Sequence, residues 1–360
     1  MIVPVKLADR SYTIVVECGA LATVGDRLRD LGVGSRVVIV SDATVLRLHG
    51  DLVRGGIERA GFTTSVIEVP QGEAAKTLAV AERCWNALLE AGLDRGSTVV
   101  ALGGGTVGDV AGFVAATYMR GVNLVHLPTT VLAQLDSSIG GKTAINHPRA
   151  KNLIGAFHQP RLVVVDPAVV QTMEDRAFRS GLAEMAKHGV VLDAEYFGEL
   201  EQDAGRLVAR DLTALERAIG GSCRLKAWVV ERDEKEAELR AVLNYGHTIG
   251  HALETVTRYE TLTHGEAVAL GMVAEARIAE RRGLASGETT RRQEALLAAL
   301  RLPVRMAGID PEAVLAAIGH DKKSRDGRVP FVLAPTIGTF RLVHDVTADD
   351  VRAALADLAA

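Results

Sequence analysis

Hydrophobic runs alternate with amphipathic segments through the first half of the chain. Short runs rich in β-branched residues predict strands at 12–16, 36–41, 64–69, 98–102, 123–127 and 162–165. Apolar positions at helical spacing predict helices at 21–31, 45–60, 77–91 and 107–117. Because strands and helices alternate, we predict a layered α/β domain with a largely parallel sheet.

The pattern changes near residue 172. Alanine, leucine and glutamate at helical spacing then dominate, until residues 326–343 predict a short late hairpin. We therefore predict two domains, an α/β domain over residues 1–172 and a mostly helical domain over residues 173–360. The cleft between two such domains is the default location for a site.

One segment, RAVLNYGHTIGHALE at residues 240–254, carries a dense polar stripe. Arg240, Asn244, His247 and His251 are spaced so that, on one α-helix, they project within an arc of roughly 60°. The opposite side of such a helix is apolar, which indicates burial. Since buried polar groups need partners, the stripe predicts a cavity that holds an anion, a metal or both.

Composition excludes several classes of protein. The 360 residues suffice for two domains, and 48% hydrophobic with 24% charged residues is typical of a folded globular protein. With 41 basic and 45 acidic residues the net charge is −4, which excludes a generally basic nucleic-acid-binding surface. Aromatic residues, at 4%, are too sparse for base-stacking platforms.

Cysteine usage and the first residues predict a cytoplasmic protein. Cys18, Cys84 and Cys223 lie far apart and form no Cys-x-x-Cys pair, so a disulfide framework is not expected. The start of the chain lacks a signal pattern, and the chain contains no apolar run of about 18 residues.

A glycine-rich loop follows the strand predicted at 98–102. Gly103, Gly105 and Gly108 match the G-x-G-x-x-G spacing, which predicts either a pyrophosphate site in a Rossmann-like domain or an ordinary tight turn. The acidic ribose partner expected about 20 residues later is absent. Asp42, after an earlier strand, is either a substitute ribose partner or a helix N-cap.

A lysine-rich segment spans residues 135–160. It places Asp136, Lys142, Lys151 and Asn152 between glycines and a proline. This composition suits binding of a phosphorylated or carboxylated small molecule, and the alternative is a solvated polar loop.

Glu184, His247 and His264 form a Glu/His/His zinc set that leaves an open position for substrate oxygens. The rival pair, His247 with His251, has the spacing of zinc proteases but lacks their glutamate, because residue 248 is threonine. The alternative interpretation of any one of these histidines is a hydrogen-bonded core residue that binds no metal.

Further motifs run along most of the chain: PQGEAAK, ALGGGTVGDVAGF, YMRG, PTTVLAQLDSSIGGKTAINH, KNLIGAFHQP, SGLAEMAK, LRAVLNYGHTIGHALE, HGEAVALGM and DKK. In these motifs the chain resembles the 3-dehydroquinate synthase family of the sugar-phosphate cyclase superfamily. Four positions depart from the family pattern: His126 replaces a frequent glutamine, His188 a frequent tyrosine, Glu238 a frequent glycine and Ala177 a frequent glutamate.

The resemblance implies bound NAD, a divalent metal (zinc or cobalt) and a homodimer. The implied metal ligands are Glu184, His247 and His264. Beside Asp42, considered above, the implied NAD contacts are Gln71, Gly72, Glu73, Ala74, Ala75, Lys76, Gly105, Thr106, Val107, Gly108, Asp109, Thr129, Thr130, Lys142, Lys151, Val169, Val170, Gln171 and Thr172. The implied substrate contacts are Asp136, Lys142, Asn152, Lys187, Lys226, Arg240, Asn244, His251, one of Lys322 and Lys323, and Arg120, from the same chain or from across a dimer interface.

The implied reaction is a lyase step of the shikimate pathway, on the route to chorismate and the aromatic amino acids. It converts 3-deoxy-D-arabino-heptulosonate 7-phosphate into 3-dehydroquinate and phosphate, by oxidation with NAD, phosphate elimination, reduction, ring opening and aldol closure. Arg240, with Lys226 and Asn244, would clamp the substrate carboxylate. The other cations would hold the phosphate, and His251 is a candidate proton shuttle.

Three alternatives remain, two from other classes of protein and one from within the cyclase superfamily. A metal- and NAD-dependent polyol dehydrogenase shares the layout but has no use for so many cations. A cyclase that acts on a neutral sugar phosphate lacks a substrate carboxylate, so the presence of Arg240, Asn244 and His251 argues against it. A catalytically silent binding protein predicts no turnover even with added metal.

Overall fold

The computed structural model describes residues 1–319 and 330–359. The chain forms two compact units, the first from Met1–Met173 with Lys226–Lys235 and the second from Glu174–Leu225 with Glu236–Ala360. The predicted domain limits, 1–172 and 173–360, stay a prediction. Within the described residues, no helix is both long and apolar enough to cross a membrane.

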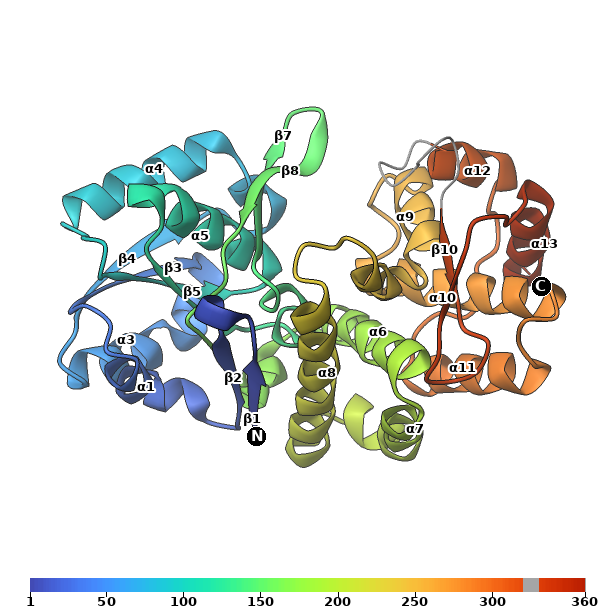
Figure 1. Ribbon diagram of the computed structural model, residues 1–360, viewed down its shortest axis with the longest axis horizontal. Coiled ribbons are helices and arrows are strands. Elements are labelled where there is room, and N and C mark those ends of the chain that lie inside the picture. Colours follow the sequence, from blue (N-terminus) through green and yellow to red (C-terminus); the bar gives the residue numbers. More distant parts are fainter. Residues whose placement is uncertain (320–329, 360) are drawn as a thin grey trace. The chain divides into compact units, whose positions relative to one another are not determined.

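A seven-stranded sheet forms the centre of the first unit (Figure 1). Its order is β1-β2-β9-β6-β5-β3-β4, and every neighbouring pair is parallel except β1 with β2. Strands β3, β5, β6 and β9 are almost entirely buried and rich in valine and leucine, as in a parallel sheet covered on both faces. The strands are β1 Ile2–Val5, β2 Tyr12–Val16, β3 Arg36–Asp42, β4 Thr63–Val69, β5 Thr98–Gly103, β6 Asn123–Pro128 and β9 Leu162–Val165.

Helices cover both faces of this sheet. In Figure 1, α4 and α5 lie on one face and α1 and α3 on the other. The helices are α1 Val24–Asp30, α2 Ala43–Val45, α3 Asp51–Arg59, α4 Leu78–Glu90 and α5 Gly105–Thr117. Short 3₁₀ or π turns lie at Ala8–Arg10, Ala20–Thr23, Leu46–Gly50, Gly72–Ala75, Tyr118–Arg120, Ala133–Ser137 and Pro167–Thr172.

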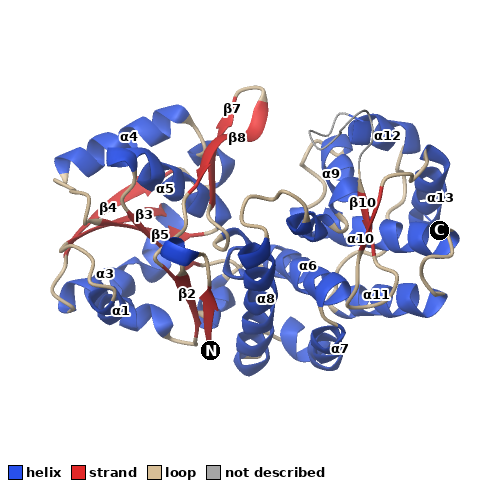
Figure 2. Cartoon of the chain, viewed as in Figure 1, coloured by secondary structure: helices blue, strands red, loops and turns tan. Residues whose placement is uncertain are grey.

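The lysine-rich segment is an antiparallel hairpin, β7 Lys142–His147 with β8 Ala150–Phe157, which extends from the sheet (Figure 2). The sequence analysis did not predict these two strands; it predicted a small-molecule binding segment, with a solvated polar loop as the alternative. Thr143 and Ile145 are buried and alternate with more exposed residues, so a strand pattern is present but short. Ile145 belongs to the core between the sheet, α4 and α5, which anchors the hairpin.

The second unit is mostly helical and contains the predicted late hairpin, β10 Phe331–Leu333 with β11 Arg341–Val343, ahead of its last helix. Its helices are α6 Asp175–Leu192, α7 Ala194–Val208, α8 Leu212–Arg232, α9 His247–Val256, α10 His264–Arg281, α11 Gly287–Ala299, α12 Pro311–Gly319 and α13 Ala348–Ala359, with a 3₁₀ segment at Leu239–Asn244. Helix α8 is shared, because the first unit includes its end from Lys226 onward. The predicted α/β and helical classes are confirmed.

Glycines bring the backbones of α6, α9 and α10 into contact. A Cβ atom on Gly271 would lie 1.9 Å from the carbonyl oxygen of Gly246, and one on Gly265 would lie 1.8 Å from that of Ser180. Neither carbonyl belongs to a flexible side chain, so only glycine allows this approach.

We expect Gly271→Ala to lower the free energy of unfolding by about 2–3 kcal/mol, because α9 and α10 must move apart. Denaturant titration measures this change. The matched control is Gly205→Ala in α7, where a Cβ meets no atom within 4 Å, and which should raise stability by about 0.5–1 kcal/mol. Equal stability of the Gly271 variant and the wild type would contradict the close contact.

Candidate active site

The segments assigned to NAD follow four parallel strands of the first unit. Residues 71–76 follow β4, 105–109 follow β5, 129–130 follow β6 and 169–172 follow β9. The carboxyl ends of parallel strands share one edge of a sheet, so the fold brings these segments to that edge. Strand β4 is added on one side of β3, whereas β5, β6 and β9 are added on the other side. The strand order therefore reverses between β3 and β5, which is the position at which such sheets bind ligands.

The glycine loop provides a helix N-terminus at this edge. Strand β5 ends at Gly103 and α5 begins at Gly105, with Gly104 as an N-cap that has no side chain to satisfy the first amides. Such amides and the helix dipole favour a pyrophosphate. The loop therefore fits a dinucleotide.

Lys76 holds the loop after β4 against α5 and the hairpin. It is 2% exposed, and its Nζ lies 2.5 Å from Asp109 Oδ2 and also donates to Asn152 Oδ1. Burial raises the pKa of Asp109, and the ammonium of Lys76 opposes this shift. Lys76 thus connects two segments assigned to NAD with Asn152, which is assigned to substrate.

Asp42 acts as a helix N-cap. Its Oδ1 accepts hydrogen bonds from the backbone amides of Thr44, at 2.9 Å, and Val45, at 3.1 Å. The structure thus supports the N-cap interpretation, and a contact with ribose stays a prediction.

Asp136 and Lys226 form an ion pair within the first unit. The Lys226 side chain is 5% exposed, whereas the side chain of Asp136 is 29% exposed, so the ammonium is buried and its carboxylate partner is half-buried. Lys142 and Lys151 lie on the β7–β8 hairpin and are exposed. Arg120 is exposed in a turn where Met119 and Arg120 both have left-handed φ angles, 50° and 67°.

His126 is a buried group that makes stability depend on pH. Burial, and then the charge of His158, lower its pKa to about 4, whereas the unfolded chain titrates near 6.5. As the pH falls from 6.5 to 4, the unfolded state therefore binds a proton that the native state excludes, and stability is lost.

We expect this residue to cost the wild type about 3 kcal/mol between pH 7 and pH 4. His126→Gln should lose correspondingly less stability over that window, as measured by denaturant titration at a series of pH values. Parallel stability curves for the two proteins would contradict a neutral buried His126.

In the second unit the polar stripe is not one continuous helix, so that prediction was wrong. Arg240 and Asn244 lie in the 3₁₀ segment Leu239–Asn244, and α9 begins at His247. Gly246 interrupts the helix with a left-handed φ of 77°. Its amide donates to the fully buried Glu275 of α10 at 2.7 Å, so a neighbouring carboxylate caps α9.

Glu184, His247 and His264 come together although they lie on α6, α9 and α10. The Nε2 atoms of His247 and His264 lie 3.6 Å and 3.8 Å from Glu184 Oε1. One ligand atom of each residue lies within 4.8 Å of the others. Tetrahedral ligands about 2.0–2.1 Å from a zinc ion are about 3.4 Å apart, so the set fits one cation.

Glu184 itself indicates a cation. It is fully buried, and neither carboxylate oxygen accepts a hydrogen bond from the described residues, although Lys187 forms an ion pair with one of them. Burial and the charge of Lys187 lower the pKa of His247, which leaves its Nε2 able to bind a metal. For His264, burial lowers the pKa, but the hydrogen bond that its ring donates to Glu254 and the charge of Glu184 outweigh this effect, and the net shift is upward.

Lys187 connects this cluster to the segment that carries Arg240 and Asn244. Its Nζ donates to Leu243 O at 2.8 Å, and its side chain is 2% exposed. Arg240 is 3% exposed, and the His251 ring lies 5.1 Å from the His247 ring. Lys187 and His251 thus lie next to the cluster of Glu184, His247 and His264. Lys187 also contacts the segment that carries Arg240 and Asn244. The predicted residues Lys322 and Lys323 lie outside the described residues.

The sequence analysis missed two buried carboxylates here, Glu254 and Glu275. Glu254 Oε2 lies 3.4 Å from His264 Nδ1. The available signal for Glu254 was its place one helical turn after His251. Glu275 gave no signal, because only the packing of α9 on α10 places it under Gly246.

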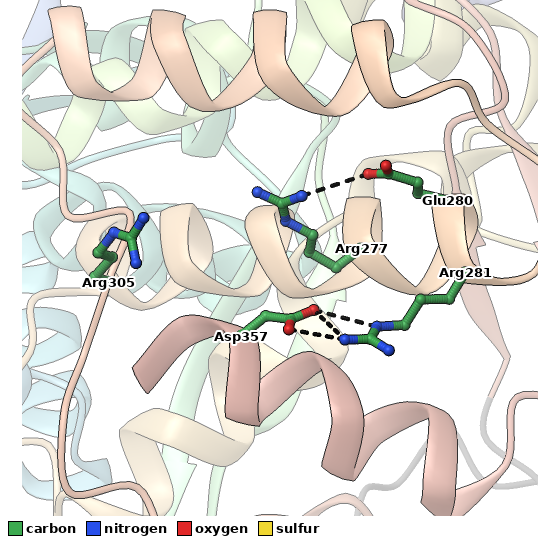
Figure 3. Close-up of a pocket in the computed structure, with 5 residues that line it drawn as sticks. All are labelled: Arg277, Glu280, Arg281, Arg305 and Asp357. Atoms are coloured by element: carbon green, nitrogen blue, oxygen red, sulfur yellow. Dashed lines mark hydrogen bonds and ion pairs between the residues drawn. The ribbon is translucent and has the colours of Figure 1, made fainter. Parts of the chain in front are cut away.

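A cavity of about 520 Å³ in this unit, lined by Arg277, Glu280, Arg281, Arg305 and Asp357, is not the site (Figure 3). Arg281 pairs with Asp357, and Arg277 pairs with Glu280 and Glu294, so its charges are largely compensated. Arg277 lies thirteen residues after His264, which is about 20 Å along α10.

Comparison with known proteins decides the family. A family model described as 3-dehydroquinate synthase N-terminal matches residues 66–180, and one described as 3-dehydroquinate synthase C-terminal matches residues 181–324. The 3-dehydroquinate synthase of Geotalea uraniireducens is 49% identical over 347 residues, 96% of each chain. The chain belongs to the 3-dehydroquinate synthase family. The 3-dehydroquinate synthase of Nostoc sp. is also 45% identical over 359 residues, 98% of each chain.

Solved structures of other cyclases are similar to this member of the 3-dehydroquinate synthase family. The 2-epi-5-epi-valiolone synthase of Streptomyces hygroscopicus subsp. jinggangensis, with NAD⁺ and Zn²⁺ bound, has a TM-score of 0.89 at 31% identity over 98% of both chains. A 2-deoxy-scyllo-inosose synthase with carbaglucose-6-phosphate, NAD⁺ and Co²⁺ also has a TM-score of 0.89, at 26% identity over 99% of this chain and 100% of that one. A probable glycerol dehydrogenase from Sinorhizobium meliloti, 17% identical, shares the fold alone. The predicted family and fold class are confirmed. NAD and zinc or cobalt, the cofactors predicted from the sequence, are those bound in these two cyclase structures.

Proposed function

We propose that the protein is a 3-dehydroquinate synthase, a lyase of the shikimate pathway that converts 3-deoxy-D-arabino-heptulosonate 7-phosphate into 3-dehydroquinate and phosphate. One observation carries the proposal. Glu184, His247 and His264 converge on one point, in a unit where Lys187 and Arg240 are buried as well. Buried cations beside a metal site suit a substrate with anionic groups.

The residues present fit both cofactors. Glu184, His247 and His264 would hold zinc or cobalt, and the loops after β4, β5, β6 and β9 would hold NAD. When bound, NAD accepts a hydride and returns it within one turnover, while the metal polarises the reacting hydroxyl groups.

The chain's own residues bind and orient the substrate. Arg240, with Asn244 and Lys226, would hold the carboxylate through charge-assisted hydrogen bonds. Lys142, Lys187, Arg120 and one of Lys322 and Lys323 would neutralise the phosphate before and after it leaves. His251, half-buried beside His247, would move protons at the substrate oxygens. Asp136, as the partner of Lys226, would keep that ammonium oriented.

We also propose that the enzyme acts as a homodimer in which Arg120 serves a phosphate, in its own subunit or in its partner. The exposed turn at Met119 and Arg120 supports this, because two successive left-handed non-glycine residues cost free energy that a binding partner can offset. Light scattering of the purified protein reports the subunit number, and a monomer at all concentrations would contradict the dimer.

Phosphate release tests the function. The purified protein with NAD and zinc should release one phosphate per heptulosonate phosphate without net NADH, lose activity after chelation and recover it with zinc or cobalt. Stoichiometric NADH in solution would instead indicate a dehydrogenase. No turnover with any added metal would indicate a silent binding protein.

A cyclase that acts on a neutral sugar phosphate is the second candidate, because a structural relative with a TM-score of 0.89, the 2-deoxy-scyllo-inosose synthase, has carbaglucose-6-phosphate bound. Identities of 45–50% to 3-dehydroquinate synthases and the presence of Arg240 and Asn244 favour the heptulosonate. Competition between sedoheptulose 7-phosphate and the heptulosonate phosphate decides, and preference for the former would refute our substrate assignment.

A further inference from the structure

The two histidines of the metal cluster are held differently on their far sides. His247 Nδ1 lies 3.1 Å from the backbone carbonyl oxygen of Tyr245. His264 Nδ1 instead lies 3.4 Å from the carboxylate Oε2 of Glu254. Both contacts leave Nε2 directed at Glu184.

We infer that Glu254 is a positioning residue for the metal ligand His264. Its carboxylate accepts the Nδ1–H of His264, which fixes the tautomer and the ring orientation and leaves the Nε2 lone pair for the metal. This inference rests on the proposed function, because it assumes that the cluster of Glu184, His247 and His264 binds a cation. Nothing in the reaction requires Glu254 to touch the substrate.

Burial explains why His264 needs this support more than His247. The His247 side chain is 12% exposed, so its neighbours restrict the ring, whereas the His264 side chain is 32% exposed. His264 is also the first residue of α10, so no preceding turn of that helix packs against it. A directed hydrogen bond therefore supplies the orientation that packing does not.

The packing of α9 on α10 brings the carboxylate into place. A Cβ on Gly250 would lie 3.0 Å from the carbonyl oxygen of Ala267, so the two backbones nearly touch there. Glu254 lies one turn after Gly250 on α9, and His264 lies about one turn before Ala267 on α10. The side chains of Glu254 and His264 therefore meet at the adjacent turn.

A charged acceptor also changes the strength of the ligand. Glu254 is 8% exposed, so its charge is weakly screened. A carboxylate behind a metal-bound imidazole raises the basicity of the ligand nitrogen more than a neutral carbonyl does, and loss of such a partner typically costs 10–100-fold in metal affinity. The two histidines thus differ in donor strength as well as in exposure.

The same atoms allow a rival interpretation as a second metal site. One ligand atom each from His251, Glu254 and His264 lies within 4.8 Å of the others. However, His264 already directs Nε2 at Glu184, and its ring would bind two cations only after losing the Nδ1 proton as well. The hydrogen-bonded interpretation needs no such loss, so we prefer it, and the two predict different metal stoichiometries.

Metal binding by the full chain tests the inference without relying on activity. Zinc affinity of the metal-free protein is measured by competition with a chromophoric chelator, for wild type, Glu254→Ala, Glu254→Gln and the control Glu260→Gln, whose side chain is exposed. We expect one zinc per chain in every case, a 10–100-fold weaker affinity for Glu254→Ala, a smaller loss for Glu254→Gln, which keeps a neutral acceptor, and no change for the control. With cobalt in place of zinc, the visible absorption bands should shift in both Glu254 variants.

Results that differ from these expectations would contradict either the positioning role of Glu254 or the proposed metal site. Wild-type affinity and an unshifted cobalt spectrum in both variants would overturn the positioning role, even if their melting temperatures fell. Two zinc ions in the wild type and one in Glu254→Ala, with the tighter affinity unchanged, would establish the second metal site instead. If Glu254→Ala does not fold, the isosteric Glu254→Gln decides, and a wild type that binds no metal would refute the proposed function itself.

Discussion

Glu184→Gln is expected to weaken zinc binding about a thousandfold and to leave less than about 1% of the phosphate-releasing activity. The change removes the only negatively charged ligand of the cluster and replaces it with a weak neutral one. It also leaves Lys187 buried at 2% exposure without its carboxylate partner. Chelator competition measures the affinity, and a continuous phosphate assay with saturating NAD measures the activity.

The matched control is Glu199→Gln, an exposed glutamate on α7 of the same unit. It removes the same charge from the same unit and should keep wild-type zinc affinity and activity. If Glu184→Gln bound zinc as tightly as the wild type, the cation would have to lie elsewhere, and the assignment of His247 and His264 would fail with it.

The sheet could be predicted because its signal is local. The central strands β3, β5, β6 and β9 are buried on both faces, so each appears in the sequence as a continuous apolar run, and all four predicted ranges agree with the structure to within one residue. Strand β7 escaped prediction because only Thr143 and Ile145 are buried in it. The missing information was its packing partner, the core around α5, which the local sequence does not report.

The polar stripe shows a different limit. The spacing of Arg240, Asn244, His247 and His251 predicts one helical face, but Gly246 adopts a left-handed conformation and divides the segment. Periodicity does not reveal such a break, since glycine also occurs within helices. The break is stabilised by Glu275, a residue on another helix, so its cause lies in tertiary structure.

The candidate site follows the same division. The resemblance assigns Glu184, His247 and His264 as metal ligands, and the fold brings these three residues together. That they bind a metal stays a prediction. Glu254 has a local signal, its place one helical turn after His251, but its contact with His264 depends on the packing of α9 on α10. Glu275 has no such signal, because only that packing places it at the amide of Gly246. Asp42 had two interpretations from the sequence, and the amides that follow it favour the cap.

Arg240→Ala is expected to raise KM and to lower kcat/KM by about 2–4 kcal/mol, or roughly 30–1,000-fold. Arg240 is 3% exposed, so its guanidinium would meet the substrate carboxylate largely without water, where a charge-assisted pair is strong. Arg240→Lys keeps the charge but loses the planar fork, so it should recover part of the loss. Steady-state kinetics of phosphate release measure all three proteins.

The substrate gives this prediction its control. Sedoheptulose 7-phosphate lacks the carboxylate, so Arg240→Ala should lower kcat/KM for it far less than for the heptulosonate phosphate. The ratio of the two kcat/KM values should therefore fall by nearly as much as kcat/KM for the heptulosonate phosphate falls. As a control, Arg291→Ala removes an exposed arginine on α11 and should leave kcat/KM unchanged for both substrates. An equal loss on both substrates would place Arg240 in the architecture of the metal site, and not in the clamp that selects the carboxylate, since the segment at Leu239–Asn244 also holds Lys187 through Leu243.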